Sequence, residues 1–317
     1  MLKKLKQRVL LSIVLAGLIY LAFTVYANFT QVLQAFGLFN WLLLPLLLLL
    51  SFLNYFARFL KWDFYLSVIR VEIKKVDSFS TFMSGLIMSV TPAKLGEVLK
   101  SVLVKEITGV PISKTAPIIL AERITDFLSL LIIAITGAYI FDYGGKITII
   151  VAIFFILLIL IISNKKIALP IINFAERISF IKKYIHNVHS AYESSYQLLK
   201  PKPLLQMTVL SLVAWGFECI GYYIILLNFN IDFGVLWAFF SYSFSTIIGA
   251  ISMLPGGLGL TEGSLTFLLI QKQVAADIAV TTTFIIRVVT LWFAVLVGIV
   301  SLTLYQKRYG SFKEKSY

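Results

Sequence analysis

The sequence has few charged residues, a single cysteine and two histidines, and these shortages exclude most classes of soluble protein. Only 14% of its 317 residues are charged, whereas 59% are hydrophobic and the mean hydropathy is +0.92. A soluble domain usually has about 25% charged and about 45–50% apolar residues. One water-facing globule cannot bury so many apolar side chains, so we predict an integral membrane protein.

The shortage of cysteine and histidine also removes most metal chemistry. Cys219 has no second cysteine with which to form a disulfide or a metal set. His186 and His189 stand three residues apart in a polar segment without a third ligand nearby, which favours a solvated helix face over a metal site. The sequence also contains no nucleophile elbow and no phosphate-cradling glycine loop. We therefore expect no metal, no cofactor and a protein that is not an enzyme.

Long apolar runs predict the architecture. A helix needs about 20 apolar residues to cross a bilayer, and six windows qualify: residues 9–27, 41–60, 117–141, 146–163, 204–228 and 281–305. Two further apolar stretches, 78–105 and 234–271, contain Pro and Gly in their middles, and their second arms are too short to cross. We predict an all-α polytopic protein with about six spans and two re-entrant helical hairpins, forming one transmembrane domain over residues 1–317.

The positive charges predict the orientation of the chain. The formal net charge is +13, and 28 residues are Lys or Arg. With both termini cytoplasmic, only Lys146 and Lys272 lie in outer loops, and Arg123 and Arg287 lie inside spans. The other basic residues then face the cytoplasm, as the positive-inside rule requires. The charge therefore indicates a multi-pass topology in the cell (plasma) membrane rather than nucleic-acid binding.

A polar stretch at 164–203 is predicted to be cytoplasmic and amphipathic. Apolar residues recur in it at spacings of three and four, namely Ile171, Phe174, Ile178, Ile181, Ile185, Val188 and Tyr192. Two interpretations stay open. The helix lies on the inner leaflet against lipid headgroups, or it packs across the cytoplasmic ends of the spans.

The two interrupted stretches resemble each other. Residues 89–96 and 252–259 share Ser, Pro, Leu and Gly in the same register, and at nearly the same distance beyond each proline stands an arginine of the next span, Arg123 or Arg287. Three crossings separate the two hairpins, so the second unit is expected to be inverted. We predict an inverted repeat with units at about 78–141 and 234–305, an architecture that recurs in transporters.

Each break frees backbone groups that lipid cannot satisfy. The residues at the breaks are Pro92 and Gly96 in the first hairpin, and Pro255, Gly256, Gly257 and Gly259 in the second. The amides at which each second arm restarts as a helix carry partial positive charge and suit an anionic group such as phosphate. The alternative is a loop whose polar groups are satisfied by their own neighbours.

Ionisable residues at membrane depth are costly and are usually functional. The candidates here are Lys94, Glu97, Glu122, Arg123, Asp126, Glu218, Glu262 and Arg287. Three cations face five carboxylates in this set, which leaves some carboxylates to be protonated or to bind a cation. Arginine is a good phosphate ligand, so Arg123 and Arg287 are the best candidates for holding a lipid headgroup. The alternative is that these charges only pair with one another to hold the bundle.

Several motifs occur together over nearly the whole chain. They are Arg58 followed by Trp62, the runs Thr91-Pro-Ala-Lys-Leu-Gly-Glu97, Ala121-Glu-Arg-Ile-Thr-Asp126 and Leu254-Pro-Gly-Gly-Leu-Gly-Leu-Thr-Glu-Gly263, and Arg287. This combination resembles the transmembrane domain family of lysylphosphatidylglycerol synthetase/flippase proteins. Lys94 departs from the pattern, which has a small or Arg-like residue there. The sequence also has no appended domain for aminoacyl or glycosyl transfer, so we do not expect synthesis.

The resemblance implies movement of an aminoacylated anionic lipid between leaflets, and related members work with lipid-linked sugars. Our first hypothesis is a flippase or scramblase for an anionic phospholipid, an aminoacylated phospholipid or a lipid-linked phosphate, with the headgroup held at the midplane loops. The alternative is a non-transporting membrane partner that binds a lipid-linked substrate and presents it to a separate transferase. An intramembrane enzyme ranks third, because no nucleophile or metal set is present. The expected partners are membrane lipids and, in the alternative, a transferase.

Overall fold

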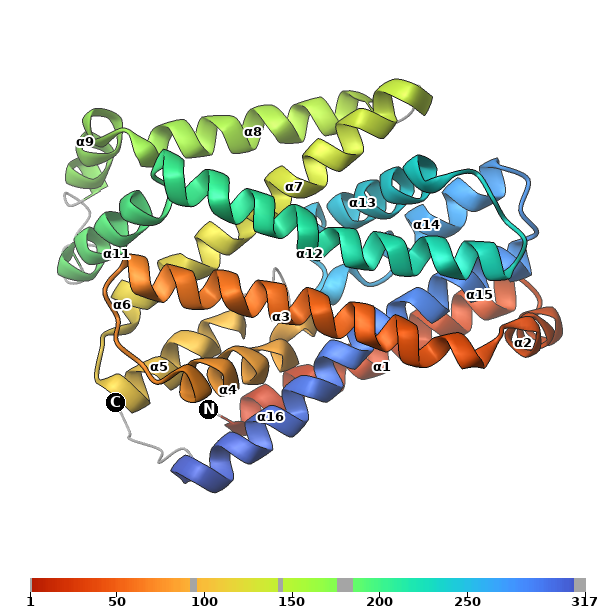
Figure 1. Cartoon of the computed structure of the whole chain (residues 1–317), viewed down its shortest axis with the longest axis horizontal. Helices are drawn as coiled ribbons and strands as arrows, with labels where there is room; N and C mark the ends of the chain where they lie inside the picture. Colours follow the sequence, from red (N-terminus) through yellow and green to blue (C-terminus); the bar gives the residue numbers. More distant parts are fainter. Residues whose placement is uncertain (1, 92–95, 142–144, 176–184, 311–317) are drawn as a thin grey trace.

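Every element of the computed structural model is a helix in the residues that it describes, which are 2–91, 96–141, 145–175 and 185–310 (Figure 1). The longer helices are α1 (Leu2–Tyr26), α3 (Leu44–Val68), α7 (Pro117–Phe141), α8 (Gly145–Ser163), α12 (Pro201–Asn228), α13 (Val235–Ile251) and α16 (Phe293–Tyr309). The shorter ones are α2 (Phe29–Leu38), α4 (Lys75–Gly85), α5 (Leu99–Thr108), α6 (Ile112–Thr115), α9 (Lys165–Ala175), α11 (Ile185–Leu198), α14 (Leu260–Gln271) and α15 (Ala276–Arg287). Tighter or wider turns are η1 (Trp41–Leu43), η2 (Leu86–Val90), η4 (Pro255–Gly257) and η5 (Val288–Trp292). The prediction of an all-α protein is confirmed.

The membrane-crossing segments agree with the predicted spans. Within the described ranges, five segments are long and apolar enough to cross a bilayer: Trp41–Val68, Ile112–Phe141, Gly145–Ser163, Pro201–Asn228 and Ala276–Tyr309. A sixth forms if α1, from Leu10 onward, and α2 count as one span bent by 98°. The second span continues beyond its predicted end at residue 60, because the charged side chains that interrupt its apolar run point into the bundle.

Proline and left-handed residues mark the ends of these helices. Pro45 and Pro201 lie in the first turn of α3 and α12, where an amide would have no helical partner. At the other end of α3, Arg70 has a φ of 53°, and Val71 donates a backbone hydrogen bond of 2.9 Å to Leu66. Gln273 closes α14 in the same way, with a φ of 63°. These are helix ends at which glycine is the usual residue.

Both predicted hairpins are present. In the first, α4 and η2 lead to the break and α5 returns; in the second, α13 and η4 lead to the break and α14 returns. With 10 residues in α5 and 12 in α14, each returning arm is too short to cross. The hairpins enter the bundle from opposite ends, and their tips meet where η2 contacts η4 (Figure 1). An inverted relation between units 78–141 and 234–305, and their union in one domain, stay predictions.

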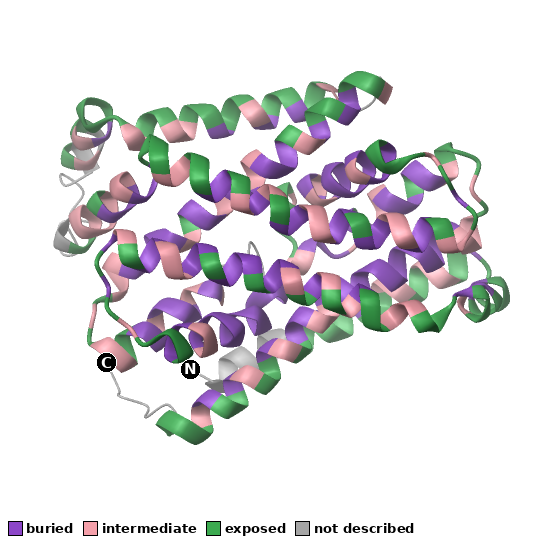
Figure 2. Ribbon diagram, viewed as in Figure 1, coloured by how far each residue is buried: buried purple, intermediate pink, exposed green. Residues whose placement is uncertain are grey.

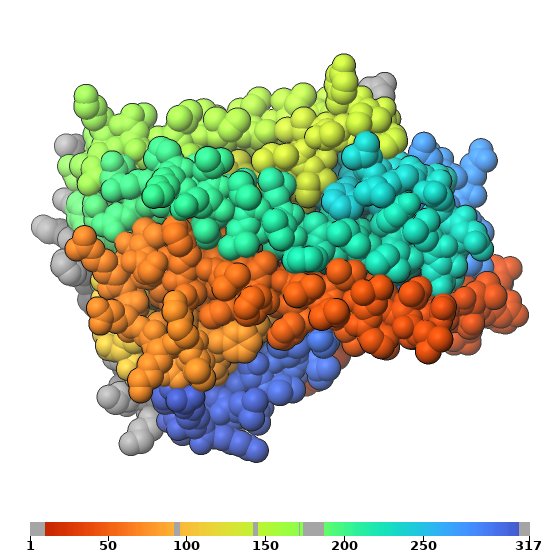
Figure 3. All heavy atoms as spheres, in the orientation of Figure 1, coloured from red at the N-terminus to blue at the C-terminus, as the bar shows by residue number. Residues whose placement is uncertain are grey.

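The helices around the hairpins separate a buried interior from an apolar surface. α3 packs along α12, and the two lie side by side across one face of the molecule (Figure 3). α7 packs against α12 and α13, whereas α8 packs mainly on α7 and leaves most of its side chains exposed (Figure 2). Exposed side chains such as Phe154 and Leu157 suit contact with lipid. Burial in this chain is therefore concentrated around the two hairpins.

The stretch 164–203 forms two helices, α9 and α11, and residues 176–184 between them lie outside the described residues. α11 packs on α6 and α7, which is the second of the two interpretations of this stretch. Lys165 of α9 forms an ion pair of 2.9 Å with Glu193 of α11. Tyr192 donates a hydrogen bond to the backbone oxygen of Ile162 at the end of α8. α11 is thus held across the end of the bundle by contacts with α8 and α9 in addition to α6 and α7.

Candidate functional site

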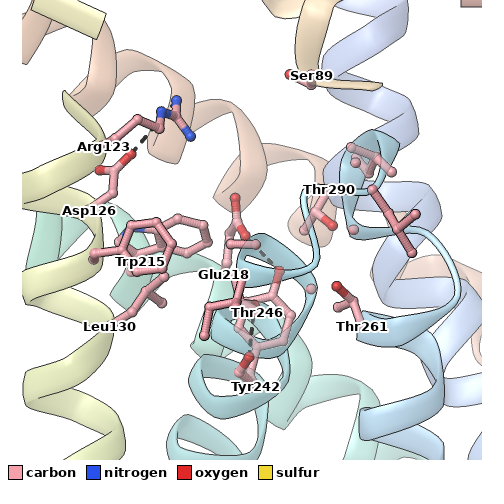
Figure 4. A pocket seen from close by; sticks show the side chains of 18 of the residues that line it. Ser89, Arg123, Asp126, Leu130, Trp215, Glu218, Tyr242, Thr246, Thr261 and Thr290 are labelled. Carbon is pink, nitrogen blue, oxygen red and sulfur yellow. Dashed lines mark hydrogen bonds and ion pairs between the residues drawn. The ribbon is translucent and has the colours of Figure 1, made fainter. Parts of the chain in front are cut away.

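The hairpin tips border an internal cavity of about 540 Å³ (Figure 4). Its walls come from α3, α7, α8, α12, α13, η4 and the turn from α15 into η5. In Figure 4, Arg123 and Asp126 of α7 lie on one side of the cavity and Thr261 and Thr290 on the other, with Glu218 of α12 between them. The cavity is therefore the place at which both predicted repeat units and the spans between them come together.

The cavity has a polar floor and an apolar rim. The charged residues that line it are Arg58, Arg123, Asp126, Glu218 and Arg287. Along the rim lie Phe154 of α8 and Met253 beside η4, whose side chains are also exposed on the outer surface. Because these apolar residues face both the cavity and the surroundings of the bundle, the cavity adjoins the region that lipid would fill. Such a wall suits an amphipathic ligand.

An equivalent ion pair stands at each hairpin. Arg123 of α7 lies 2.9 Å from Glu97, which precedes α5, and Arg287 of α15 lies 2.6 Å from Glu262 in the first turn of α14. In both cases the carboxylate belongs to the returning arm and the arginine belongs to the span that follows. The sequence suggested Asp126 as the partner of Arg123, but their atoms are 4.0 Å apart and Glu97 is closer. Each pair ties a hairpin to the next span.

The second break is satisfied by the chain's own side chains. Arg287 donates a hydrogen bond of 2.5 Å to the backbone oxygen of Gly256, and Glu262 accepts one of 2.7 Å from the amide of Gly259. Gly257 has a φ of 68°, and a Cβ there would lie 3.1 Å from the backbone of Gly249, so glycine is required. The restart amide was expected to be open to an external anion. It is instead capped by Glu262, because this carboxylate sits three residues into the new helix.

At the first break, the structure describes the chain up to Thr91 and again from Gly96 onward. Pro92 and Lys94 lie outside the described residues. The amide of Gly96 donates to the hydroxyl of Thr91 at 3.1 Å, so this restart is also satisfied from within the protein. A Cβ on Gly96 would lie 2.5 Å from the sulfur of Met88, so a larger residue here would require the side chains of Met88 and Thr91 to move.

Three further buried cations pair with carboxylates of the predicted site. Lys61 lies 2.5 Å from Asp126, and Arg58 lies 3.6 Å from the same carboxylate. Lys100 lies 2.5 Å from Glu122 and 3.5 Å from Glu97, and its ammonium stands 4.8 Å from the ring centre of Trp62. Arg58, Lys61 and Lys100 were predicted to face the cytoplasm, and the structure shows them buried instead. With Arg123 and Arg287 they match the five buried carboxylates of the predicted site, so the expected surplus of carboxylates is wrong.

The sequence contained a pattern from which the burial of two of these cations, Arg58 and Lys61, could have been predicted. Asn54, Arg58, Lys61 and Tyr65 follow one another at spacings of four, three and four, which places them on one face of α3. All four are buried. A polar stripe of this kind in a span indicates a polar interior rather than the end of the span. No comparable signal marks Lys100, which lies on the short arm α5.

Two further polar side chains complete the floor. Glu218 accepts a hydrogen bond of 2.6 Å from the hydroxyl of Tyr242. Trp215 lines the cavity, and its indole nitrogen is buried without a hydrogen-bond partner among the described residues. The same holds for Nε of Arg123, whose side chain keeps 20% of its surface exposed. Both nitrogens are donors, and both belong to residues of the cavity wall.

The arrangement offers no metal site within the described part of the chain, where no three His, Cys, Asp or Glu side chains come together. Of the predicted site residues, Arg123, Asp126, Glu218, Arg287, Gly256 and Gly257 line the cavity. Glu97 and Glu262 contact its arginines, and Glu122 binds Lys100 away from the cavity. The site thus consists of charged pairs around a cavity, which suits binding and positioning of a polar group in an apolar setting.

Comparison with known proteins defines the class. Residues 9–298 match the family described as the lysylphosphatidylglycerol synthase TM region, and the chain belongs to this family of membrane proteins. A UPF0104 membrane protein of Methanocaldococcus jannaschii is 27% identical over 223 residues, which cover 67% of this chain and 91% of the relative. One from Methanothermobacter thermautotrophicus is 20% identical over 307 residues, covering 90% of each chain. Another, from Pyrococcus horikoshii, is 22% identical over 266 residues, covering 75% of this chain and 79% of the relative.

Proposed function

We propose that this protein moves a lipid with a phosphate-bearing headgroup between the leaflets of the membrane. The substrate class comprises anionic phospholipids, aminoacylated phospholipids and lipid-linked phosphates. The observation that carries the proposal is the cavity between the hairpin tips, which joins a charged floor to an apolar rim. The headgroup occupies the floor, and the acyl or prenyl tails stay in the bilayer beyond the rim.

The donors on the floor support a phosphate as the bound group. Arg123 engages Glu97 through one terminal nitrogen and keeps its Nε for a ligand, and the indole N–H of Trp215 is a second donor in the same wall. Hydrogen bonds from a guanidinium to phosphate oxygens are among the strongest in proteins. Because Glu97 neutralises part of the arginine charge, the headgroup is held without being trapped. Such moderate binding is what a carrier requires, since the ligand must also leave.

The rim supports lateral entry of the tails. Ala250 and Met253 line the cavity and are also exposed on the outer surface, as is Phe154 across from them. A lipid that slid its headgroup past this rim would keep its tails against apolar side chains throughout. The charged floor of the cavity offers the headgroup hydrogen bonds that the bare bilayer lacks, and this lowers the barrier to headgroup crossing.

Leaflet exchange in liposomes tests the proposal. Purified protein is reconstituted with fluorescent phosphatidylglycerol, and dithionite quenching reports how much lipid has crossed. Trp215→Phe removes the N–H and keeps the ring, and we expect exchange to slow about tenfold, the effect of one lost hydrogen bond to a charged group. Tyr222→Phe is the control, because Tyr222 is also a buried aromatic residue of α12 and does not line the cavity.

A second pair of variants tests the rim. Ala250→Trp places a large ring at the exposed edge of the cavity and is expected to block exchange without disturbing the core. Val213→Trp makes the same kind of change on the exposed face of α12, away from the cavity, and is expected to leave exchange unchanged. Equal rates for wild type, Trp215→Phe and Ala250→Trp would overturn the proposal. If no variant or wild type exchanges lipid but lipid still co-purifies, the protein presents its lipid to a partner instead.

A further inference from the structure

A second pocket, of about 610 Å³, lies at the end of the bundle where α1 begins and α16 ends. It is bordered by the end of α3, by α6, by α11 and by the start of α12. None of its lining residues lines the central cavity. By the positive-inside argument, this end faces the cytoplasm. The pocket is therefore a feature separate from the central cavity.

Three cations converge on this pocket. Arg70 follows α3, Lys114 belongs to α6, and Lys200 precedes α12. Within the described ranges, no ion pair joins any of the three to a carboxylate. Three like charges at one pocket repel one another, and an anion in the pocket would relieve that repulsion.

The acidic residue of the pocket does not neutralise these cations. Glu193 is bound by Lys165 of α9 at 2.9 Å and accepts a hydrogen bond of 3.4 Å from Gln197. Its ion-pair partner is thus a lysine outside the lining set, and Lys200 acts on it only as a more distant charge. The pocket keeps three positive charges against one carboxylate that is already paired.

Neutral donors lie beside the cations. Ser190, Ser194 and Gln197 line the pocket at spacings of four and three, so they share one face of α11. Hydroxyl and amide groups of this kind complete the coordination of an oxyanion held by lysine and arginine. The volume falls within the range of small-molecule sites, about 300–1,000 Å³.

We propose that this pocket binds a phosphate ester through Arg70, Lys114 and Lys200, with the hydroxyls of α11 as additional donors. The bound group is the phosphate of a lipid in the adjoining leaflet or of a soluble phosphorylated compound, and both present the same chemistry. The site is independent of lipid movement through the central cavity. It adds a second anion site to the protein, at the water-facing end of the spans.

Arg70 provides a clean variant because of its backbone. Its φ of 53° is a conformation that favours glycine, so Arg70→Gly removes the guanidinium and relaxes the helix end in one step. The matched control is Gln273→Gly, at the equivalent position after α14, where φ is 63°. Both variants are expected to unfold at the same temperature as wild type or higher. Only Arg70→Gly is expected to lose anion affinity.

The binding experiment uses the full chain in neutral detergent, titrated with pyrophosphate at constant ionic strength by calorimetry. We expect Arg70→Gly and Lys114→Gln each to weaken binding about tenfold, as for a lost charge-assisted hydrogen bond. The double variant is expected to show no measurable binding, and Gln273→Gly to bind like wild type. Absence of pyrophosphate binding by wild type, or equal binding by wild type and the double variant, would overturn the proposal.

A second titration distinguishes the two sources of phosphate. Dioctanoyl phosphatidic acid and glycerol phosphate carry the same headgroup chemistry, with and without acyl chains. Tighter binding of the lipid that is lost in the double variant identifies a lipid of the leaflet as ligand. Equal binding of both compounds identifies a soluble phosphate ester. Lipid binding that survives in the double variant counts against this pocket.

Discussion

At the scale of residues, the interior is organised by matched charges rather than by isolated ones. Asp126 is shared by Lys61 and Arg58, and Lys100 contacts both Glu122 and Glu97. Desolvation of each charge is costly, and only a partner with good geometry offsets that cost. The ion pairs therefore hold α3, α5 and α7 in one arrangement. They also explain why charged residues are tolerated in the middle of a span.

The pair of Lys100 and Glu122 gives a test of this role. Lys100→Met leaves the Glu122 carboxylate buried without its 2.5 Å partner, and we expect a loss of about 3–5 kcal/mol in the free energy of unfolding. Lys100→Met combined with Glu122→Gln removes both charges and is expected to recover most of that loss. Unfolding in SDS titrations measures both. A double variant as unstable as the single one would contradict a pairing role.

Close packing of backbone against backbone is the second feature that stabilises the interior at the scale of residues. A Cβ on Gly298 of α16 would lie 2.1 Å from the backbone nitrogen of Ile87 in η2, and backbone cannot move aside as a side chain can. Gly298→Ala is therefore expected to destabilise the protein by about 1–3 kcal/mol. Gly216 of α12 has nothing within 4 Å of such a Cβ, so Gly216→Ala is expected to be neutral or stabilising. Thermal unfolding of the two variants in detergent decides between these outcomes.

At the scale of elements, the hairpins combine two short arms with a tight break. The returning arms are too short to cross, and in the second hairpin Arg287 and Glu262 bind backbone groups at the break. Because lipid supplies no hydrogen bonds, this internal satisfaction is a condition for placing a break inside a membrane protein. The contact of η2 with η4 agrees with this condition, since it places protein rather than lipid beside the second break.

The ion pair between Lys165 of α9 and Glu193 of α11 leads to a prediction about the pH dependence of stability. The hydrogen bond from Lys165 holds the pKa of the Glu193 carboxyl below its usual value. The link therefore stabilises the folded state above the usual glutamate pKa, and this stabilisation is lost as the pH falls through the lowered pKa. Carboxyl NMR titration is expected to show the lowered value in wild type and a return toward free glutamate in Lys165→Met. An unchanged pKa in that variant would mean that another group causes the shift.

At the scale of the whole molecule, the two ends of the bundle differ in charge. α1 begins and α16 ends at the same end (Figure 1), and Lys114, Lys200 and Lys202 lie there as well. The other end carries Lys272 after α14. The positive-inside rule predicts that the first of these ends faces the cytoplasm. Both hairpins then approach the middle of the membrane from opposite sides.

The single cysteine allows a direct test of this topology. Cys219 is fully buried, so Cys219→Ala provides a background without reactive thiols. In that background, Lys272→Cys is expected to react with a membrane-impermeant maleimide in intact cells. Lys202→Cys, exposed at the opposite end, is expected to react only after permeabilisation. The reverse labelling pattern would invert the predicted orientation, and labelling of both sites in intact cells would contradict the topology altogether.

The sequence by itself determined the class, the spans and the positions of both breaks. These depend on local properties, namely the length of apolar runs and the placement of Pro and Gly, which act through the residues next to them. It also singled out Arg123 and Arg287, because an arginine in an apolar run stands out at once. Only the tertiary structure decided their partners. Glu97 and Glu262 reach them across helices, and Lys61 and Lys100 reach carboxylates on α7 in the same way.

The cavity and the second pocket also required the tertiary structure. Trp215 reads in sequence as one more apolar residue of a span, and only the structure shows that it lines the cavity and that its buried nitrogen lacks a partner in the described residues. Arg70, Lys114 and Lys200 read as ordinary cytoplasmic charges until the chain brings them to one pocket. Apolar patterning specifies which face of a helix is buried, but the partners of a buried charge come from segments far away in the chain. Those partners are set only when the helices pack together.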